Sequence, residues 1–103
     1  MSLQSTLLTT SPGAVFTSTG NTAAMTMYFT NYSSSNVAAF SLWAVKSGDV
    51  PENKNILYVN VTVQPGDTYL ASTERLLLDN NDELYANTTA NSTMSTTLTY
   101  TNI

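Results

Sequence analysis

Side chains that can do chemistry are sparse in this chain, and the densest group of them is acidic. Asp79, Asp82 and Glu83 lie within five consecutive positions. Carboxylate oxygens are preferred calcium ligands, yet this spacing does not match the calcium-loop pattern D-x-[DN]-x-[DN]-G. The interpretation that the sequence favours is a solvated hairpin turn over residues 79–82, where Asp and Asn side chains stabilise the bend. We therefore expect no metal site and no cofactor.

Most catalytic groups are missing from the composition. The chain contains neither histidine nor cysteine. Histidine-based relays, cysteine nucleophiles and Cys/His zinc sites are therefore excluded. Paired carboxylates can hydrolyse glycosides when held at a suitable separation, but nearly all seven acidic residues fall at expected strand ends or turns. We expect no catalytic residues, and the protein is predicted not to be an enzyme.

Aromatic side chains are the remaining candidates for a binding site. A sugar-stacking platform could draw on Trp43, Tyr28, Tyr58, Tyr69, Tyr85 and Tyr100. Because β-sheets favour aromatic residues in any case, we favour positions in the core and on strand faces. The chain also has N-x-[ST] triplets that begin at Asn31, Asn60, Asn87 and Asn91. With 11 Asn and 30 Ser plus Thr, such triplets arise by chance, so we give them no weight as glycosylation sites.

The totals indicate one globular domain over residues 1–103, of which 42% are hydrophobic. The net charge is −4, and Lys46, Lys54 and Arg75 are too few to neutralise a nucleic-acid backbone. No apolar run approaches about 18 residues, so we expect no membrane span. Only 10% of the residues are charged, whereas about 25–35% is recommended for a designed free surface. Such a neutral surface suits subunit contacts, although an ordinary neutral β-domain would share it.

Alternation of apolar and polar residues with period two dominates the chain and is typical of β-strands. Many Thr and Asn residues disfavour helix. The expected strands are Gln4 to Thr9, Ala14 to Ser18, Ala23 to Asn31, Val37 to Lys46, Ile56 to Gln64, Glu74 to Leu78, Glu83 to Thr88 and Met94 to Tyr100, with Thr68 to Ala71 as an extension of the sheet. Pro65-Gly66-Asp67 predicts a type II turn with positive φ at Gly66. Seven to eight short strands predict an all-β protein, an antiparallel β-sandwich or jelly roll.

The faces of three expected strands can be assigned. In Ala23 to Asn31, one face carries Met25, Met27 and Phe29. In Val37 to Lys46 both faces are largely apolar, which predicts a central strand covered on both sides. The second cover is either a loop of this chain or a neighbouring subunit. In Ile56 to Gln64, one face is expected to carry Leu57, Val59, Val61 and Val63, and the other Ile56, Tyr58, Asn60 and Thr62.

Two regions are candidate assembly contacts. The first is the N-terminal arm Met1, Ser2 and Leu3. It is either held by a neighbouring subunit or paired within the chain as part of the first strand. The second is the outward face of the Val37 to Lys46 strand, around Trp43 and Val45. An open sheet edge that accepts a strand from a partner is a further route to assembly.

Short stretches, in order along the chain, carry a resemblance to known proteins. They are Thr6 to Pro12, Val15 to Ser18, Phe40 to Gly48, Gln64 to Tyr69, Leu76 to Asp79, Asp82 to Asn87 and Leu98 to Tyr100. Each is a strand-plus-turn pattern, and together they cover most of the chain. In these stretches the chain resembles small β-sandwich virion proteins of tailed bacteriophages, especially cyanobacterial and marine phages. One departure is Lys46-Ser47-Gly48, where a Pro-Ser-Gly turn is usual.

The resemblance implies a non-enzymatic structural protein of the virion, made in the host cytoplasm and present in symmetric, repeated copies. It supplies no catalytic residues. The first expectation is a capsid decoration, or cement, protein that stabilises the assembled phage head. Its partners would be other copies of itself, with a trimer favoured, and a major capsid or tail protein, with no nucleic acid and no membrane. Two alternatives stay open: a tail, neck or baseplate accessory protein, and a carbohydrate-binding module for host attachment.

Overall fold

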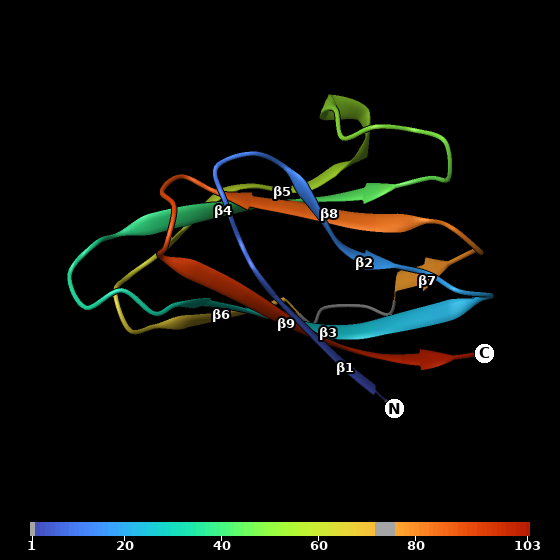
Figure 1. Ribbon diagram of the computed structural model, residues 1–103, viewed down its shortest axis with the longest axis horizontal. Coiled ribbons are helices and arrows are strands. Elements are labelled where there is room, and N and C mark those ends of the chain that lie inside the picture. Colours follow the sequence, from blue (N-terminus) through green and yellow to red (C-terminus); the bar gives the residue numbers. More distant parts are fainter. Residues whose placement is uncertain (1, 72–75) are drawn as a thin grey trace.

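The computed structural model describes residues 2–71 and 76–103, and this part of the chain forms two antiparallel β-sheets (Figure 1). Its strands are β1 (Ser2–Leu7), β2 (Gly13–Thr17), β3 (Thr22–Asn31), β4 (Ala38–Val45), β5 (Ile56–Val63), β6 (Thr68–Ala71), β7 (Leu76–Leu78), β8 (Glu83–Thr88) and β9 (Met94–Asn102). A short 3-10 helix, η1 (Asn53–Asn55), precedes β5. The predicted all-β sandwich is confirmed. Expectations for Met1, Glu74, Arg75 and the Met25 side chain lie outside the described residues.

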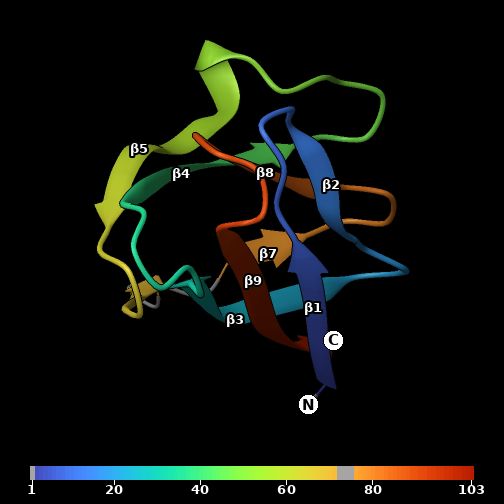
Figure 2. The same cartoon turned by 60° about the vertical axis from the view of Figure 1, so that its left-hand side comes forward.

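The strand order identifies the type of sandwich. Sheet A has the order β1-β9-β3-β6, with β7 also paired to β3, and sheet B has the order β2-β8-β4-β5. The pairs are nested along the chain: β1 with β9, β2 with β8, β3 with β6 and β7, and β4 with β5. Such a long hairpin folded over into two sheets is the arrangement of a jelly roll. Nesting brings the first and last strands, β1 and β9, side by side (Figure 2).

Two tight turns connect consecutive strands, and one of them differs from its prediction. At the β5–β6 turn, the Asp67 N–H donates to the Gln64 carbonyl at 3.0 Å, and Gly66 has a φ of 79°, which confirms the predicted type II turn. At residues 79–82, the Asp82 N–H donates to the Asp79 carbonyl at 3.0 Å. This second turn is not the predicted hairpin, because β7 belongs to sheet A and β8 to sheet B. It therefore carries the chain between the sheets.

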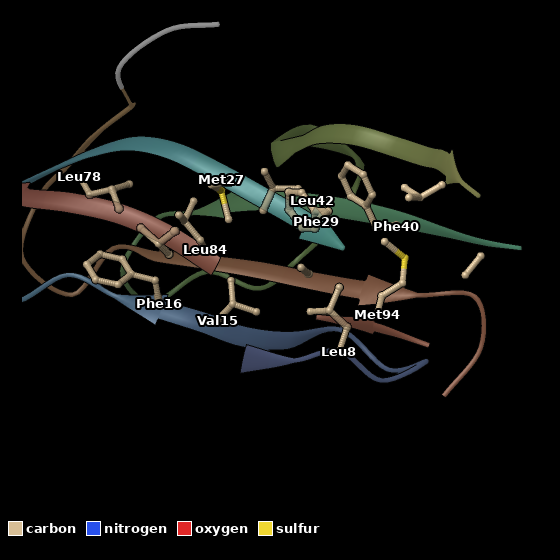
Figure 3. Close-up of a cluster of buried hydrophobic side chains, with 14 residues drawn as sticks. Leu8, Val15, Phe16, Met27, Phe29, Phe40, Leu42, Leu78, Leu84 and Met94 are labelled. Atoms are coloured by element: carbon tan, nitrogen blue, oxygen red, sulfur yellow. The ribbon is translucent and has the colours of Figure 1, made fainter. Parts of the chain in front are cut away.

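Aromatic side chains join the two sheets (Figure 3). Phe29 of β3 stacks on Phe40 of β4 with ring centroids 3.8 Å apart, and both side chains are fully buried. Tyr69 of β6 packs 5.4 Å from Phe40, centroid to centroid. Away from this stack, Phe16 of β2 packs 4.7 Å from Tyr100 of β9. These contacts link strands of sheet A to strands of sheet B, so they hold the sandwich closed.

The end of β3 is held by one buried amide. Asn31 is fully buried, and its side-chain nitrogen donates to the Asn36 and Val63 carbonyls at 2.7 and 3.0 Å. Its side-chain oxygen accepts the Ser33 N–H at 3.0 Å. A buried amide with satisfied hydrogen bonds is a structural element. Asn31 therefore ties the 32–37 loop to β5.

β5 departs from the expected assignment of its faces. Leu57 and Val59 are 47% and 63% exposed, whereas Val63 is buried in the core and Tyr58 and Val61 pack against it. Two residues of β5 occupy the position opposite Ser41, which is a β-bulge. Asn60 lies in this bulge, with a φ of 46° and its N–H bonded to the Ser41 hydroxyl at 3.0 Å. The extra residue shifts the alternation, so the predicted common face of Leu57, Val59, Val61 and Val63 was wrong.

We expect Phe40→Ala to lower the free energy of unfolding by about 3–5 kcal/mol, because it leaves a cavity between the sheets and removes the ring stack. Urea unfolding followed by circular dichroism measures this change. Leu77→Ala is the control, since Leu77 on β7 is 65% exposed and its truncation should change stability by less than about 0.5 kcal/mol. Equal losses in the two variants would contradict the central role of the stack.

Candidate assembly surfaces

β4 presents Trp43 on the outer face of sheet B. The inward residues Ala38, Phe40 and Leu42 are buried in the core, so Trp43 and Val45 point away from it. The strand lies between β8 and β5, which confirms its predicted central position. Its outer face is therefore flanked by strands on both sides.

Neighbouring strands extend the apolar surface around Trp43. Trp43 pairs with Tyr85 on β8, and both side chains are partly buried. On the other side, the bulged strand β5 turns Leu57 and Val59 outward. We call Trp43, Tyr85, Leu57 and Val59 the Trp43 face. Exposed apolar side chains gathered on one surface are typical of interaction sites.

Tyr85 also has a polar contact on this face. Its hydroxyl donates to the Glu83 carboxylate at 3.4 Å. Partial burial raises the pKa of Tyr85 above its usual value, and the Glu83 carboxylate adds to the rise. The phenol therefore stays neutral at physiological pH and serves as a hydrogen-bond donor at the side of the apolar surface.

Val45, the second candidate on β4, is only 1% exposed. It does not belong to the core cluster between the sheets, so its cover lies on the outer side. The connection of residues 46–55 stands on that side of sheet B, and η1 contacts β4 (Figures 1 and 2). The second cover expected for this strand is here a loop of the same chain. Val45 is thus shielded, and the accessible part of the surface is the Trp43 face.

Polar contacts hold this covering loop together. The Lys54 ammonium lies 3.2 Å from a Glu52 carboxylate oxygen and 3.3 Å from one of Asp49. Hydrogen bonds to Glu52 and Asp49 raise the pKa of Lys54. The Asn55 side chain accepts the Glu52 N–H and donates to the Val50 carbonyl, both at 2.9 Å. The charges of these three ionised side chains are therefore paired with one another beside sheet B.

The N-terminal candidates lie on β1, apart from Met1, which is outside the described residues. Ser2 and Leu3 pair with Tyr100 and Thr99 of β9, so this segment is held within the chain. Of the two expectations for the arm, the structure thus shows pairing within the chain as part of the first strand. Leu3 is nevertheless 70% exposed. It remains accessible to a partner.

The rows of side chains described on the outer face of sheet A are uncharged. The register of the strands defines these rows: Leu3, Thr99 and Thr26; Ser5, Thr97, Tyr28 and Leu70; Leu7, Ser95, Thr30 and Thr68. Hydroxyl groups of neighbouring strands form hydrogen bonds with one another, Ser5 with Thr97 at 3.0 Å and Thr30 with Thr68 at 2.9 Å. No acidic or basic side chain stands in these rows. The surface offers hydroxyl groups and exposed leucines without charge repulsion.

Within residues 79–83, the Asp82 and Glu83 carboxylates accept hydrogen bonds. The Asp82 carboxylate accepts the N–H groups of Asp79 at 3.0 Å and of Ser47 at 2.9 Å. Glu83 accepts the Thr17 hydroxyl at 2.9 Å. Across residues 2–71 and 76–103, no three acidic, histidine or cysteine side chains are grouped so as to hold a metal ion. These contacts match the turn-stabilising role that the sequence favoured for Asp82.

The aromatic residues do not form one platform. Tyr58, Tyr69 and Tyr100 pack against the core. Tyr28 lies on sheet A, in the row that contains Thr97. Trp43 and Tyr85 are the neighbouring aromatic pair on the outer face of sheet B. Stacking of a sugar on two neighbouring rings of one sheet face would therefore use these two side chains.

Comparisons with known proteins give no assignment. No family model, no curated protein and no solved structure matches the chain. Its function must therefore be argued from the surfaces themselves.

We expect Asp82→Ala to lower the free energy of unfolding by about 1–3 kcal/mol, because two backbone N–H groups lose a charged acceptor. Thermal unfolding measures the effect. Asp79→Ala is the matched control. Asp79 lies in the same turn, but its carboxylate accepts no hydrogen bond from the described residues. Calcium should leave the melting temperature of the unmodified protein unchanged. A calcium-dependent rise that Asp82→Ala abolishes would instead establish a calcium site.

Proposed function

We propose that this chain is a structural protein of a virion, a capsid decoration subunit that binds the assembled head of a tailed phage through the Trp43 face. The observation that carries the proposal is the exposure of Leu57 and Val59 beside Trp43. These side chains would lose their contact with water when a partner covers them, which is favourable. The sheet behind them is backed by the Phe29–Phe40 stack, so the surface is held in shape before it binds.

The fold and the charge distribution support this role. Jelly rolls are used by viral capsid proteins and by lectins, although a fold alone assigns no function. The chain has few charges, and the outer face of sheet A has none in its rows. Many copies can therefore stand close together on a lattice with little repulsion.

The mechanism of stabilisation is mass action. A subunit that binds the assembled lattice, and not the separated capsid proteins, lowers the free energy of the assembled state by its own binding free energy. Many equivalent sites repeat this contribution over the whole shell. A small rigid domain with one apolar surface is sufficient, because no chemical step is required.

The head and tail assignments differ in copy number. A decoration protein should be present in purified virions in amounts comparable to the major capsid protein, because symmetric lattices repeat each site. A tail, neck or baseplate accessory protein should be far less abundant. Quantitative mass spectrometry of purified particles separates the two assignments, and complete absence from the particles would reject both.

The neighbouring pair Trp43 and Tyr85 favours carbohydrate binding as a second candidate function. Aromatic faces can stack on the apolar face of a sugar ring. Trp43→Ala would then abolish saturable binding of the isolated protein to host polysaccharide and leave assembly on the head unchanged. If the decoration proposal holds, the isolated protein shows no such binding.

We expect Leu57→Lys combined with Val59→Lys to weaken binding to phage heads that lack the protein by at least about tenfold, or 1.4 kcal/mol. The reason is that two charges would have to be desolvated in the interface. Leu70→Lys is the matched control, because Leu70 is 53% exposed on the opposite sheet. Co-sedimentation with the heads measures binding. Unchanged binding by the double variant would contradict a role for the Trp43 face.

A further inference from the structure

β1 is an edge strand without the usual protection against pairing. It ends sheet A, and among the described residues its second edge has no partner strand. Five of its six residues are exposed. Natural edge strands commonly carry a charge, a proline or a bulge that blocks a further strand. β1 has the sequence SLQSTL and pairs with β9 in an unbroken register, so it has none of these.

The hydrogen-bond pattern shows which backbone groups of β1 are free. The Leu8 N–H, just beyond the strand, donates to the Met94 carbonyl at 3.0 Å. Bonded and non-bonded pairs alternate along an antiparallel ladder. In the register of β1 with β9, the backbone groups of alternate residues, including Gln4, therefore face β9. Those of Leu3, Ser5 and Leu7 face the open edge.

The side chains of these same three residues share the outer face of sheet A. Leu3 and Leu7 are 70% and 69% exposed, and Ser5 lies midway between them. The arrangement Leu3-x-Ser5-x-Leu7 reads the same from either direction. An antiparallel second copy of β1 would therefore meet a matching set of side chains.

We infer that β1 pairs with β1 of a second copy about a two-fold axis at Ser5, so that sheet A continues across the two copies. In this register Leu3 stands opposite the partner's Leu7, and Ser5 opposite the partner's Ser5. Each of the three facing pairs exchanges two backbone hydrogen bonds. A shift by two residues leaves only two facing pairs and places Leu against Ser. The Ser5-centred register is therefore the one that satisfies both backbone and side chains.

A second copy fits this edge better than an unrelated peptide. Any extended segment could bond to the backbone, but the symmetric leucines add two apolar cross-strand pairs when the partner is β1 itself. The uncharged rows of sheet A also continue across the axis without repulsion. Such an interface is isologous and closes as a dimer.

This inference goes beyond the proposed function, because it concerns association of the chain with itself rather than with the phage head. A two-fold contact produces dimers, in place of the trimer that the sequence favoured. The contact uses β1 on sheet A, whereas the proposed head contact uses the Trp43 face on sheet B. The two surfaces can therefore be tested separately.

Cysteine cross-linking tests the axis, because the natural chain has no cysteine. Facing residues of a hydrogen-bonded antiparallel pair have Cα atoms about 5.5 Å apart, within disulfide reach. We expect purified Ser5→Cys to form a disulfide-linked dimer under mild oxidation. Thr62→Cys, an exposed position on edge strand β5 of sheet B, is the matched control and should remain monomeric. Circular dichroism verifies that both variants are folded.

The register gives a second, sharper test. Two copies of Leu3 would be offset by four residues along the paired strands, about 13 Å, which is beyond disulfide reach. Leu3→Cys alone and Leu7→Cys alone should therefore stay unlinked, whereas an equimolar mixture should give a heterodimer. The inference would be overturned if Ser5→Cys cross-linked no faster than Thr62→Cys. It would also be overturned if Leu3→Cys cross-linked equally well alone and in the mixture.

Analytical ultracentrifugation provides a test without cysteine. The unmodified protein should show a concentration-dependent dimer, and Leu3→Lys combined with Leu7→Lys should be monomeric, because like charges would face each other. Leu77→Lys, also an exposed leucine on sheet A, should dimerise normally. A monomeric unmodified protein would overturn the inference and leave head binding through the Trp43 face unaffected. If the unmodified protein forms these dimers but does not bind phage heads that lack it, only the proposed function is rejected.

Discussion

Contact between Phe29 and Phe40 decides how the two sheets face each other. The rings come from β3 and β4, which lie inside their sheets rather than at the edges, and they stack at 3.8 Å with both side chains fully buried. Because residues alternate across a strand, the inward position of Phe40 places Trp43 on the outer face of β4. The same rule places Tyr28, next to Phe29, on the outer face of sheet A. The core stack thus determines which side chains are available for contact.

A domain of this kind leaves two different outer surfaces. The Trp43 face is apolar and adjoins a loop in which Lys54 is paired with Asp49 and Glu52. The outer face of sheet A is lined by hydroxyl groups that bond across strands, with leucines at its β1 edge. One surface suits burial against a different protein, and the other suits continuation of a sheet. This division explains how one small domain could engage a lattice and a second copy at the same time.

Local signals in the sequence anticipated part of the β5 geometry and missed the rest. Pro65-Gly66 indicated the turn after β5, because only a few residue types adopt its dihedral angles. Asn60 was also a signal, since Asn tolerates positive φ, but its place within an apolar run concealed the bulge. As a result Leu57 and Val59 were assigned to the wrong face. They are the residues that make the Trp43 face accessible.

By itself the sequence determined most of the β-strands, the common face of Met27 and Phe29 and the turn at Gly66, because these follow from backbone geometry over a few residues. It also excluded histidine and cysteine chemistry. Among the described residues, tertiary structure decided that the 79–82 turn crosses between sheets, that the 46–55 connection lies over the outer side of sheet B, and that the second edge of β1 has no partner strand. Each of these depends on which distant segments pair, and strand pairing is set by contacts between residues far apart in the chain. No local pattern contains that information.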